Sequence, residues 1–308
     1  MVTPYGVFVA TGRVTRHPPH PVQLYEAVGL GIATAWGLRV WRGHRRLAGT
    51  AIVLATLGSA APAQAGEAWD STAYARVLEA HVRPATIVGI RLAAVDYAAV
   101  PGDPHYARAL AALAAARPEV LDGDAARIAF WINAYNLLAV KAVVDRYPVR
   151  SIKDGGTLLQ SIWKRKVGTV GDREYALDEI EHDILRARYR DPRVHMAIVC
   201  ASLSCPDLRG EPYVAERLEA QLADATRRFL ANPTKGLHPA GDGRTARVSA
   251  IFKWFAGDFG GPDGVARFIR ATADPAVAER VRGLEGRGLS YLHYDWSLND
   301  ARRTERSP

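Results

Sequence analysis

The amino-acid sequence predicts an α+β protein: a mainly helical single domain with a small antiparallel sheet. Apolar residues recur at three- and four-residue spacing through much of residues 72–271, which is typical of amphipathic helices. Two short segments flank Gly171 and Asp172, and this arrangement is typical of a β-hairpin. No internal repeat or linker divides residues 66–300, so we expect one domain over that range.

The expected helices follow from apolar periodicity and from helix-end signals. They cover residues 72–82, 104–115, 122–146, 177–189, 214–230 and 264–271. The segment 122–146 has the strongest pattern, and it ends before Pro148 because proline cannot continue a helix. Its centre, FWINAYNLLAV, is apolar on almost every face. We therefore expect the buried helix of the domain there.

The expected strands are short. Residues 167–170 and 173–176 form the hairpin, and residues 245–249 and 289–296 are candidate strands. The segment 251–259 instead carries a cluster of aromatic side chains beside a lysine: Lys253, Trp254, Phe255 and Phe259. Such a cluster is compatible with a ligand groove, but its spacing is more typical of a hydrophobic core.

The charge is unevenly distributed. The chain carries a formal charge of +8, and residues 1–65 hold six arginines against one glutamate, which accounts for +5 of it. The difference, +8 minus +5, leaves only +3 for residues 66–308. Nucleic-acid binding requires a basic patch on the folded body, so we expect no nucleic-acid partner.

The N-terminal region has the order of a secretory signal peptide. A basic cluster at residues 42–46 precedes an apolar run at 47–61, and Ala63-Gln64-Ala65 is a small-residue cleavage site. We therefore expect a signal peptide over 42–65 and a periplasmic or secreted protein. If residues 1–65 are retained, the chain is anchored at the inner membrane, and only this segment contacts a membrane.

Both ends of the chain lie outside the expected domain. Residues 1–41 are either a membrane-like segment or a mis-started one, and residues 20–38, which begin HPVQLYEA, resemble a C-terminal fragment of prolipoprotein diacylglyceryl transferase. Residues 301–308 are charged, and we expect a disordered tail there.

The stretch 191–206, DPRVHMAIVCASLSCP, concentrates the reactive side chains. It contains both cysteines of the chain, Cys200 and Cys205, together with His195. One interpretation is a disulfide, since an exported chain with two cysteines enters an oxidising compartment. Closing so small a ring contributes about 2 kcal/mol before strain.

A second interpretation is nucleophilic catalysis by Cys200 or Cys205. The thiol then needs a histidine base and a group that orients the histidine. The candidate bases are His182 and His195. The candidate orienting residues are Glu181, Asp183, Asn133 and Asn136. The same set occurs in papain-like and transglutaminase-like enzymes, whose arrangement would be permuted here.

The choice of base depends on the local structure. On a regular strand, His195 and Cys200 would face opposite sides because five positions separate them, which favours His182. The two asparagines have a simpler interpretation, in which they hydrogen-bond buried backbone.

Two further interpretations of the stretch remain open. The two histidines and two cysteines could hold a metal, although no second cysteine pair accompanies them. Alternatively, the stretch is a buried structural loop without chemistry. No glycine-rich phosphate loop, dinucleotide fingerprint or paired-histidine zinc helix is present, and we expect no cofactor.

Five ordered motifs resemble the domain-of-unknown-function family 547 over about residues 90–300. They are FWINAYNLLAVKAV, LDEIEHDILR, DPRVHMAIVCASLSCPDLR, VSAIFKWFAGDFGG and YLHYDWSLND. The resemblance implies an exported bacterial protein but no defined biochemical role. From the residues themselves we expect a cysteine-dependent hydrolase or acyl/peptidyl transferase that acts on a small molecule or peptide. The alternative is a non-catalytic periplasmic binding or interaction module with a Cys200–Cys205 disulfide.

Overall fold

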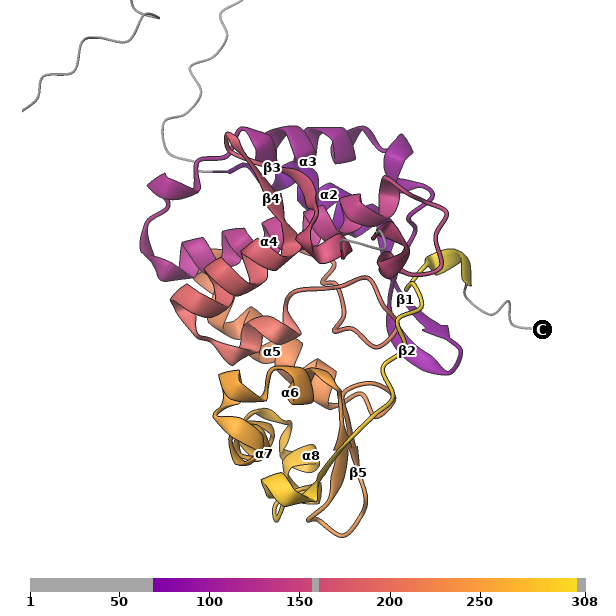
Figure 1. Cartoon of the computed structure of the whole chain (residues 1–308), viewed down its shortest axis with the longest axis vertical. Coiled ribbons are helices and arrows are strands. Elements are labelled where there is room, and N and C mark those ends of the chain that lie inside the picture. The colour runs from indigo at the N-terminus through magenta and orange to yellow at the C-terminus, as the bar shows by residue number, and fades with distance from the viewer. Residues whose placement is uncertain (1–68, 157–160, 304–308) are drawn as a thin grey trace, which may run out of the picture. The chain divides into compact units, whose positions relative to one another are not determined.

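The computed structural model describes residues 69–156 and 161–303, which belong to one compact unit, Gln64–Pro308 (Figure 1). The expected signal peptide, the upstream segment and the stretch resembling the transferase all lie outside the described residues. The described residues are mainly helical and carry small sheets, which confirms the α+β prediction. The permuted papain-like arrangement stays a prediction.

The first hydrophobic core is built around one buried helix. Helix α4 (Gly123–Val144) packs against the hairpin of β3 (Lys166–Val170) and β4 (Arg173–Ala176), with α2 (Thr72–His81) and α3 (Pro104–Ala114) nearby (Figure 1). The helix is apolar enough to cross a membrane, but 83% of its apolar window is buried inside the protein. The prediction of a buried core helix is confirmed.

A close approach fixes the hairpin against this helix. Gly168 of β3 lies so near Leu138 of α4 that a Cβ atom at that position would clash with the leucine side chain. The hairpin itself has the strands and the Gly171-Asp172 turn that the sequence predicts, because Gly171 takes a positive φ of 63°.

The second core lies in the C-terminal half. It is enclosed by helices α5 (Leu218–Leu230), α6 (Ile251–Trp254), α7 (Gly261–Thr272) and α8 (Pro275–Arg280) and by a sheet of β5 (Leu237–Pro239), β6 (Ala246–Val248) and β7 (Leu289–Tyr291). Strand β6 pairs antiparallel with β5 but parallel with β7, so the antiparallel prediction is wrong for β7. The reason is the helical crossover between β6 and β7, which brings the chain back in the same direction.

A second hairpin was not predicted. Strands β1 (Val82–Ile87) and β2 (Ile90–Val95) are joined by Val88 and Gly89, both with positive φ. A β-branched residue is unusual in that region of φ, which hides the turn from a sequence reading. The hairpin packs against Ala301, which is buried within the short 3₁₀ helix η10 (Ala301–Arg303). The prediction of a disordered tail is therefore wrong for residues 301–303. Residues 304–308 lie outside the described residues.

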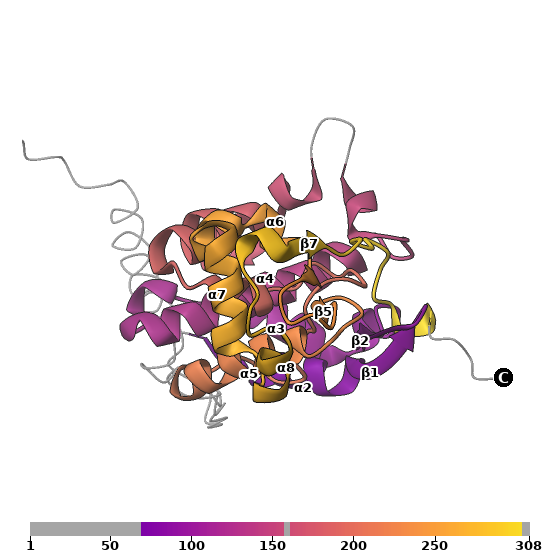
Figure 2. The ribbon, with the colours of Figure 1, turned by 90° about the horizontal axis from the view of Figure 1, so that it is seen from below.

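The stretch 191–206 connects the two cores. Val194 and Ala197 pack in the first core, Met196 packs in the second, and Cys200 contacts both. The C-terminal segment after β7 runs from the second core back toward the β1–β2 hairpin (Figures 1 and 2). It bonds to the stretch on the way, since the Leu203 N–H donates to the carbonyl of Ser297 at 2.8 Å.

Two local structures differ from prediction. Residues Glu179–Tyr189 (η5) wind as a π-helix, a form that is rare and often found at functional sites. Residues Pro192–Met196 (η6) form a 3₁₀ helix instead of a strand, with Asp191 capping its start. The alternation of side chains along a strand therefore does not apply between His195 and Cys200.

Candidate functional site

The two cysteines form a close pair of free thiols. Their Sγ atoms lie 2.9 Å apart, and the backbone N–H of Cys200 also donates to Cys205 Sγ at 2.8 Å. Ala201, between them, has a φ of 59°, a left-handed conformation that costs a non-glycine residue about 1 kcal/mol. The loop is thus folded tightly enough to bring the sulfurs together without a covalent bond.

Cys200 Sγ has three hydrogen-bonding partners. The sulfur lies 3.3 Å from Ser202 Oγ and 3.2 Å from the hydroxyl of Tyr294, in addition to Cys205. The Cys205 hydrogen bond, followed by those from Ser202 and Tyr294, lowers the pKa of the Cys200 thiol although burial opposes the shift. The surroundings therefore favour the thiolate of Cys200.

Cys205 has the opposite character. Only 3% of it is exposed, whereas Cys200 is partly exposed. Burial, and then the neighbouring Cys200, raise the pKa of the Cys205 thiol well above its ordinary value. The pair is therefore asymmetric, with one accessible, acidic thiol and one buried, weakly acidic thiol.

Two buried polar residues hold the ends of the thiol loop. Asn136 on α4 donates to the carbonyl of Ala197 at 3.0 Å and accepts from the Val199 N–H at 2.9 Å, just before Cys200. At the other end, Lys235 Nζ donates to the carbonyl of Cys205 at 2.8 Å and to Asp207 Oδ1 at 2.6 Å.

Asn133 makes an equivalent clamp elsewhere. It donates to the carbonyl of Tyr213 at 2.7 Å and accepts from the Tyr213 N–H at 2.9 Å. Both asparagines therefore use their amide oxygen and nitrogen on buried backbone, which is the simpler of the two roles considered from the sequence.

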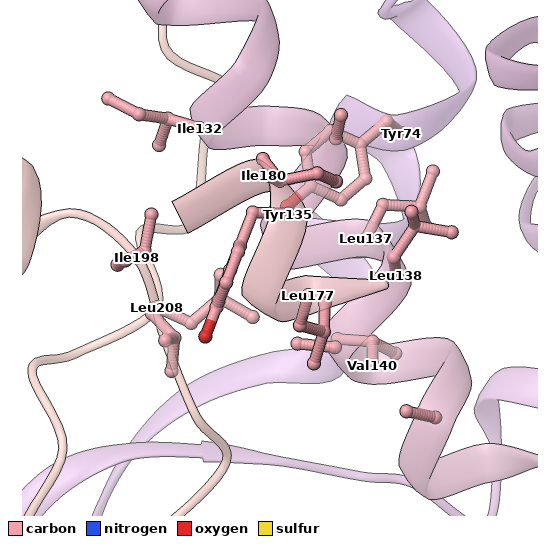
Figure 3. Close-up of a cluster of buried hydrophobic side chains, with 14 of the residues drawn as sticks. Tyr74, Ile132, Tyr135, Leu137, Leu138, Val140, Leu177, Ile180, Ile198 and Leu208 are labelled. Atoms are coloured by element: carbon pink, nitrogen blue, oxygen red, sulfur yellow. The ribbon is translucent and has the colours of Figure 1, made fainter. Parts of the chain in front are cut away.

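Glu181 carries a buried carboxyl that shares a cavity with the two thiols. Glu181 lies on η5 and accepts a 3.4 Å hydrogen bond from the hydroxyl of Tyr135, which projects from α4 among apolar side chains including Ile198 and Leu208 (Figure 3). Burial, and then the negative charge of a Cys200 thiolate, raise the pKa of Glu181 to about 7. A group with that pKa both gives and takes protons near neutral pH.

His195 lies behind Glu181 rather than beside a thiol. Its Nε2 is 2.7 Å from Asp258 Oδ2, and its Nδ1 is 3.9 Å from Glu181 Oε1. Burial lowers the pKa of His195 to about 4 despite the bond to Asp258, so the ring is neutral at pH 7. We assign the Nε2 proton to the Asp258 bond because a carboxylate only accepts, which leaves Nδ1 without a proton and facing Glu181.

Asp258 is held by an arginine of η5. Arg186 donates to both carboxylate oxygens of Asp258, at 2.6 and 2.9 Å. Its third nitrogen donates to His182 Nδ1 at 2.6 Å, and His182 Nε2 lies 3.4 Å from Asp178. In the described part of the chain, neither His182 nor His195 is hydrogen-bonded to a cysteine sulfur.

A cavity of about 210 Å³ opens over these groups. Of the predicted site residues, Cys200, Cys205, Glu181 and His182 line it, whereas His195, Asp183, Asn133 and Asn136 stand outside its lining. Much of the remaining wall is aromatic: Tyr135, Trp163, Trp254, Phe255, Tyr294 and Trp296.

The tryptophans form one connected cluster. Trp254 and Trp296 are stacked with ring centroids 5.6 Å apart, and Trp163 meets Trp296 edge-on at 5.5 Å. Trp254 remains 47% exposed at the cavity, and the Lys153 ammonium lies 3.8 Å from the centroid of the Trp296 ring. Trp254 and Phe255 therefore line the site, while Phe259 packs in the second core as the sequence suggested for the whole cluster.

Several site residues were missed by the sequence interpretation: Ser202, Lys235, Asp258 and Tyr294. Asp258 and Tyr294 belong to the motifs VSAIFKWFAGDFGG and YLHYDWSLND, so those motifs carried a signal. Lys235 gave none, because a lysine in a polar loop is indistinguishable from a solvated one. The described residues also contain no group of three or more His, Cys, Asp and Glu side chains arranged to hold a metal ion.

A known family model matches the region of the chain that contains the two cysteines. Residues 118–230 match the family model described as "Protein of unknown function, DUF547", which confirms the resemblance over this range. All the predicted site residues fall inside the match, and Asp258 and Tyr294 lie beyond it. No curated protein and no solved structure matches the chain.

Proposed function

We propose that this protein, with its DUF547 region, is a cysteine-dependent hydrolase or acyl/peptidyl transferase in which Cys200 is the nucleophile. One observation carries the proposal. The partly exposed thiol of Cys200 lines the same cavity as the buried carboxyl of Glu181. A thiolate and a proton-transferring group in one partly enclosed cavity are the parts that covalent acyl transfer needs.

The donors around Cys200 prepare the attacking atom. The contacts with Tyr294, Ser202 and Cys205 stabilise its thiolate, and the thiolate rather than the thiol is the nucleophile. In the first step the sulfur bonds to a carbonyl carbon of the substrate. The bond to the leaving group breaks, and the leaving group takes the proton of Glu181.

In the second step, Glu181 accepts a proton instead of giving one. As a carboxylate it accepts the proton of an incoming water or amine, which attacks the thioester carbon while the Cys200 thiolate leaves. With a pKa raised to about 7, Glu181 is suited to both steps at neutral pH. The candidate bases from the sequence were His182 and His195. We propose Glu181 for this role instead, because neither histidine is hydrogen-bonded to a cysteine sulfur in the described residues.

His195 becomes a positioning residue in this scheme. Its neutral ring links the Arg186–Asp258 ion pair to the Glu181 carboxyl. His195 Nε2 lies 2.7 Å from Asp258 Oδ2, and His195 Nδ1 lies 3.9 Å from Glu181 Oε1. Such outer partners fix the orientation of a reacting group without touching the substrate.

The wall of the cavity indicates the kind of substrate. Three tryptophans and Phe255 offer flat apolar faces, and Asp178 adds a negative charge at the rim. About 210 Å³ accommodates one side chain or a small acyl group rather than a folded partner. We therefore propose a small ester, amide or peptide with an aromatic or apolar group next to the reacting carbonyl.

The second candidate is a non-catalytic periplasmic module closed by a Cys200–Cys205 disulfide. The Sγ separation of 2.9 Å favours it, because little movement separates the two thiols from a covalent bond. The two candidates differ in the reduced protein. A reduced hydrolase is acylated at Cys200 and turns the ester over, whereas a reduced non-catalytic module has a free Cys200 thiol but does not turn the ester over.

Acylation by p-nitrophenyl acetate tests the leading proposal. The reduced protein should release a burst of nitrophenol and carry an acetyl group on Cys200, located by peptide mass spectrometry. Glu181→Gln should keep the burst, since nitrophenol leaves without acid help, but should hydrolyse the acyl-enzyme about a hundredfold more slowly. An undiminished burst in Cys200→Ser, shown by circular dichroism to be folded, would overturn the proposal.

A further inference from the structure

The thiol pair has a second property that acyl transfer does not use. The two sulfurs touch, one of them is accessible from the cavity, and the other lies almost fully buried on its floor. Acyl transfer requires one thiol only. Cys205 therefore has no essential role in the proposed hydrolysis beyond its hydrogen bond to Cys200.

We infer that Cys200 and Cys205 are an attacking and a resolving thiol, which react with small aromatic disulfides and thereby switch the acyl-transfer site off. The inference rests on the proposed function only for that switch, since the exchange itself needs no acyl chemistry. Both cysteines line the cavity; the attacking thiol is that of the partly exposed Cys200, and the resolving thiol is that of the buried Cys205.

The thiol–disulfide exchange takes two steps. The Cys200 thiolate attacks one sulfur of a disulfide RSSR, the S–S bond breaks, and RS⁻ takes a proton to leave as RSH. Cys205 then gives up its proton and attacks Cys200 Sγ in the mixed disulfide. The second RS⁻ leaves and is protonated. The sum is RSSR plus two thiols giving two RSH plus the Cys200–Cys205 disulfide, so RSSR is the oxidant.

Three contacts favour the second step over accumulation of the mixed disulfide. The Cys200 N–H points at Cys205 Sγ at 2.8 Å, and a hydrogen bond to sulfur stabilises the developing Cys205 thiolate. The sulfurs are already 2.9 Å apart, against about 2.05 Å in a disulfide. The buried Lys235, bonded to the carbonyl of Cys205, holds the resolving residue in place.

The residues that line the cavity determine which disulfides can reach Cys200. An RSSR molecule must place one sulfur at Cys200 beneath Trp254, Phe255 and Trp296, and flat aromatic R groups stack on such faces. Because Asp178 and Glu181 also line the cavity, neutral reagents should enter more readily than anionic ones.

Reaction of the reduced, full-length protein with dithiodipyridine tests the inference, since this neutral aromatic disulfide releases a coloured thiopyridone. The wild type should release two equivalents and keep no pyridyl group. Cys205→Ser should release one equivalent and keep one pyridyl group on Cys200. Cys200→Ser should react at least tenfold more slowly because Cys205 is buried. Circular dichroism verifies that both variants are folded.

The contrary results are equally specific. A wild type that keeps a pyridyl group, or a Cys200→Ser variant that reacts as fast as Cys205→Ser, would overturn the assignment of the two roles. The acylation burst separates this inference from the proposed function. If the exchange proceeds as described but the reduced protein shows no burst, the exchange stands and the hydrolase fails. If the reduced protein shows a burst that survives oxidation and needs no reductant, the switch is wrong.

Discussion

The imidazole of His195 is hydrogen-bonded through Nε2 to Asp258 Oδ2 at 2.7 Å. This bond bears directly on which residue can act as the base of the proposed reaction. Burial lowers the pKa of this ring to about 4, which makes it a weak base toward a thiol at neutral pH, and neither of its nitrogens is hydrogen-bonded to a cysteine sulfur in the described residues. We propose the proton-transferring role for Glu181 instead, because its carboxyl lies 3.9 Å from the His195 ring and lines the same cavity as both cysteines.

The stability of the protein should depend on pH through Glu181. Its folded pKa, about 7, is above its ordinary value of 4.5. The folded state then binds the proton more tightly, so the stabilisation is fully present below pH 4.5 and is lost as pH rises through 7. A shift of this size corresponds to about 3 kcal/mol.

Urea unfolding of the wild type and of Glu181→Gln at several pH values isolates this contribution. His195 has the opposite sign, because its lowered pKa makes stability fall as pH drops from 6.5 toward 4, but both proteins share it. The wild type should lose stability relative to the variant between pH 4.5 and 7.5. A constant difference across that range would show that Glu181 is not a buried, proton-retaining group.

Tyr294 should control the reactivity of Cys200. Its hydroxyl lies 3.2 Å from the sulfur, and removing one donor to a charged acceptor costs about 1.5 kcal/mol, or roughly tenfold in thiolate population at a given pH. Tyr294→Phe should therefore move the pH midpoint of iodoacetamide alkylation upward by about one unit. Tyr291→Phe, at a partly exposed tyrosine outside the cavity lining, is the matched control and should leave the midpoint unchanged.

Lys235 should be among the most sensitive residues for stability. It is 2% exposed and pairs with the half-buried Asp207, so replacement by methionine leaves Asp207 without its cation and the carbonyl of Cys205 without its donor. Breaking a fully buried pair costs about 3–5 kcal/mol, and the partial exposure of Asp207 reduces this to about 2–3 kcal/mol. The free energy of unfolding of Lys235→Met measures it, and Lys253→Met, at an exposed lysine, is the control. A loss below about 1 kcal/mol would contradict the buried ion pair.

Trp254 should govern substrate binding rather than the chemical steps. It is 47% exposed over the cavity and stacks on Trp296, so its removal takes away an aromatic face without touching Cys200. Trp254→Ala should raise KM for an aromatic ester about tenfold and leave kcat nearly unchanged, since uniform binding is lost. An equal effect on an acetyl ester would argue against an aromatic substrate group.

Much of the fold was readable in the sequence because it rests on neighbours along the chain. The apolar run FWINAYNLLAV and the proline at 148 predict the buried helix α4, and Gly171-Asp172 predicts the β3–β4 hairpin. Both signals are local: the hydrophobic period and the turn residue act over a few positions. The hairpin of β1 and β2 was not predicted because it lacks such a local signal: its turn contains a valine at a positive φ, and valine is not a typical turn residue.

The site was readable only in part. The sequence places Cys200 and Cys205 only four residues apart, which allows the two thiols to meet but leaves the disulfide, nucleophile, metal and structural interpretations open. Which thiol is acidic, which group moves protons and which aromatic rings form the wall depend on Glu181, Asp258 and Tyr294. These residues come from separate parts of the chain, and packing between two hydrophobic cores places them around the thiols. Burial and long-range contacts set their pKa values, and no local pattern encodes those contacts.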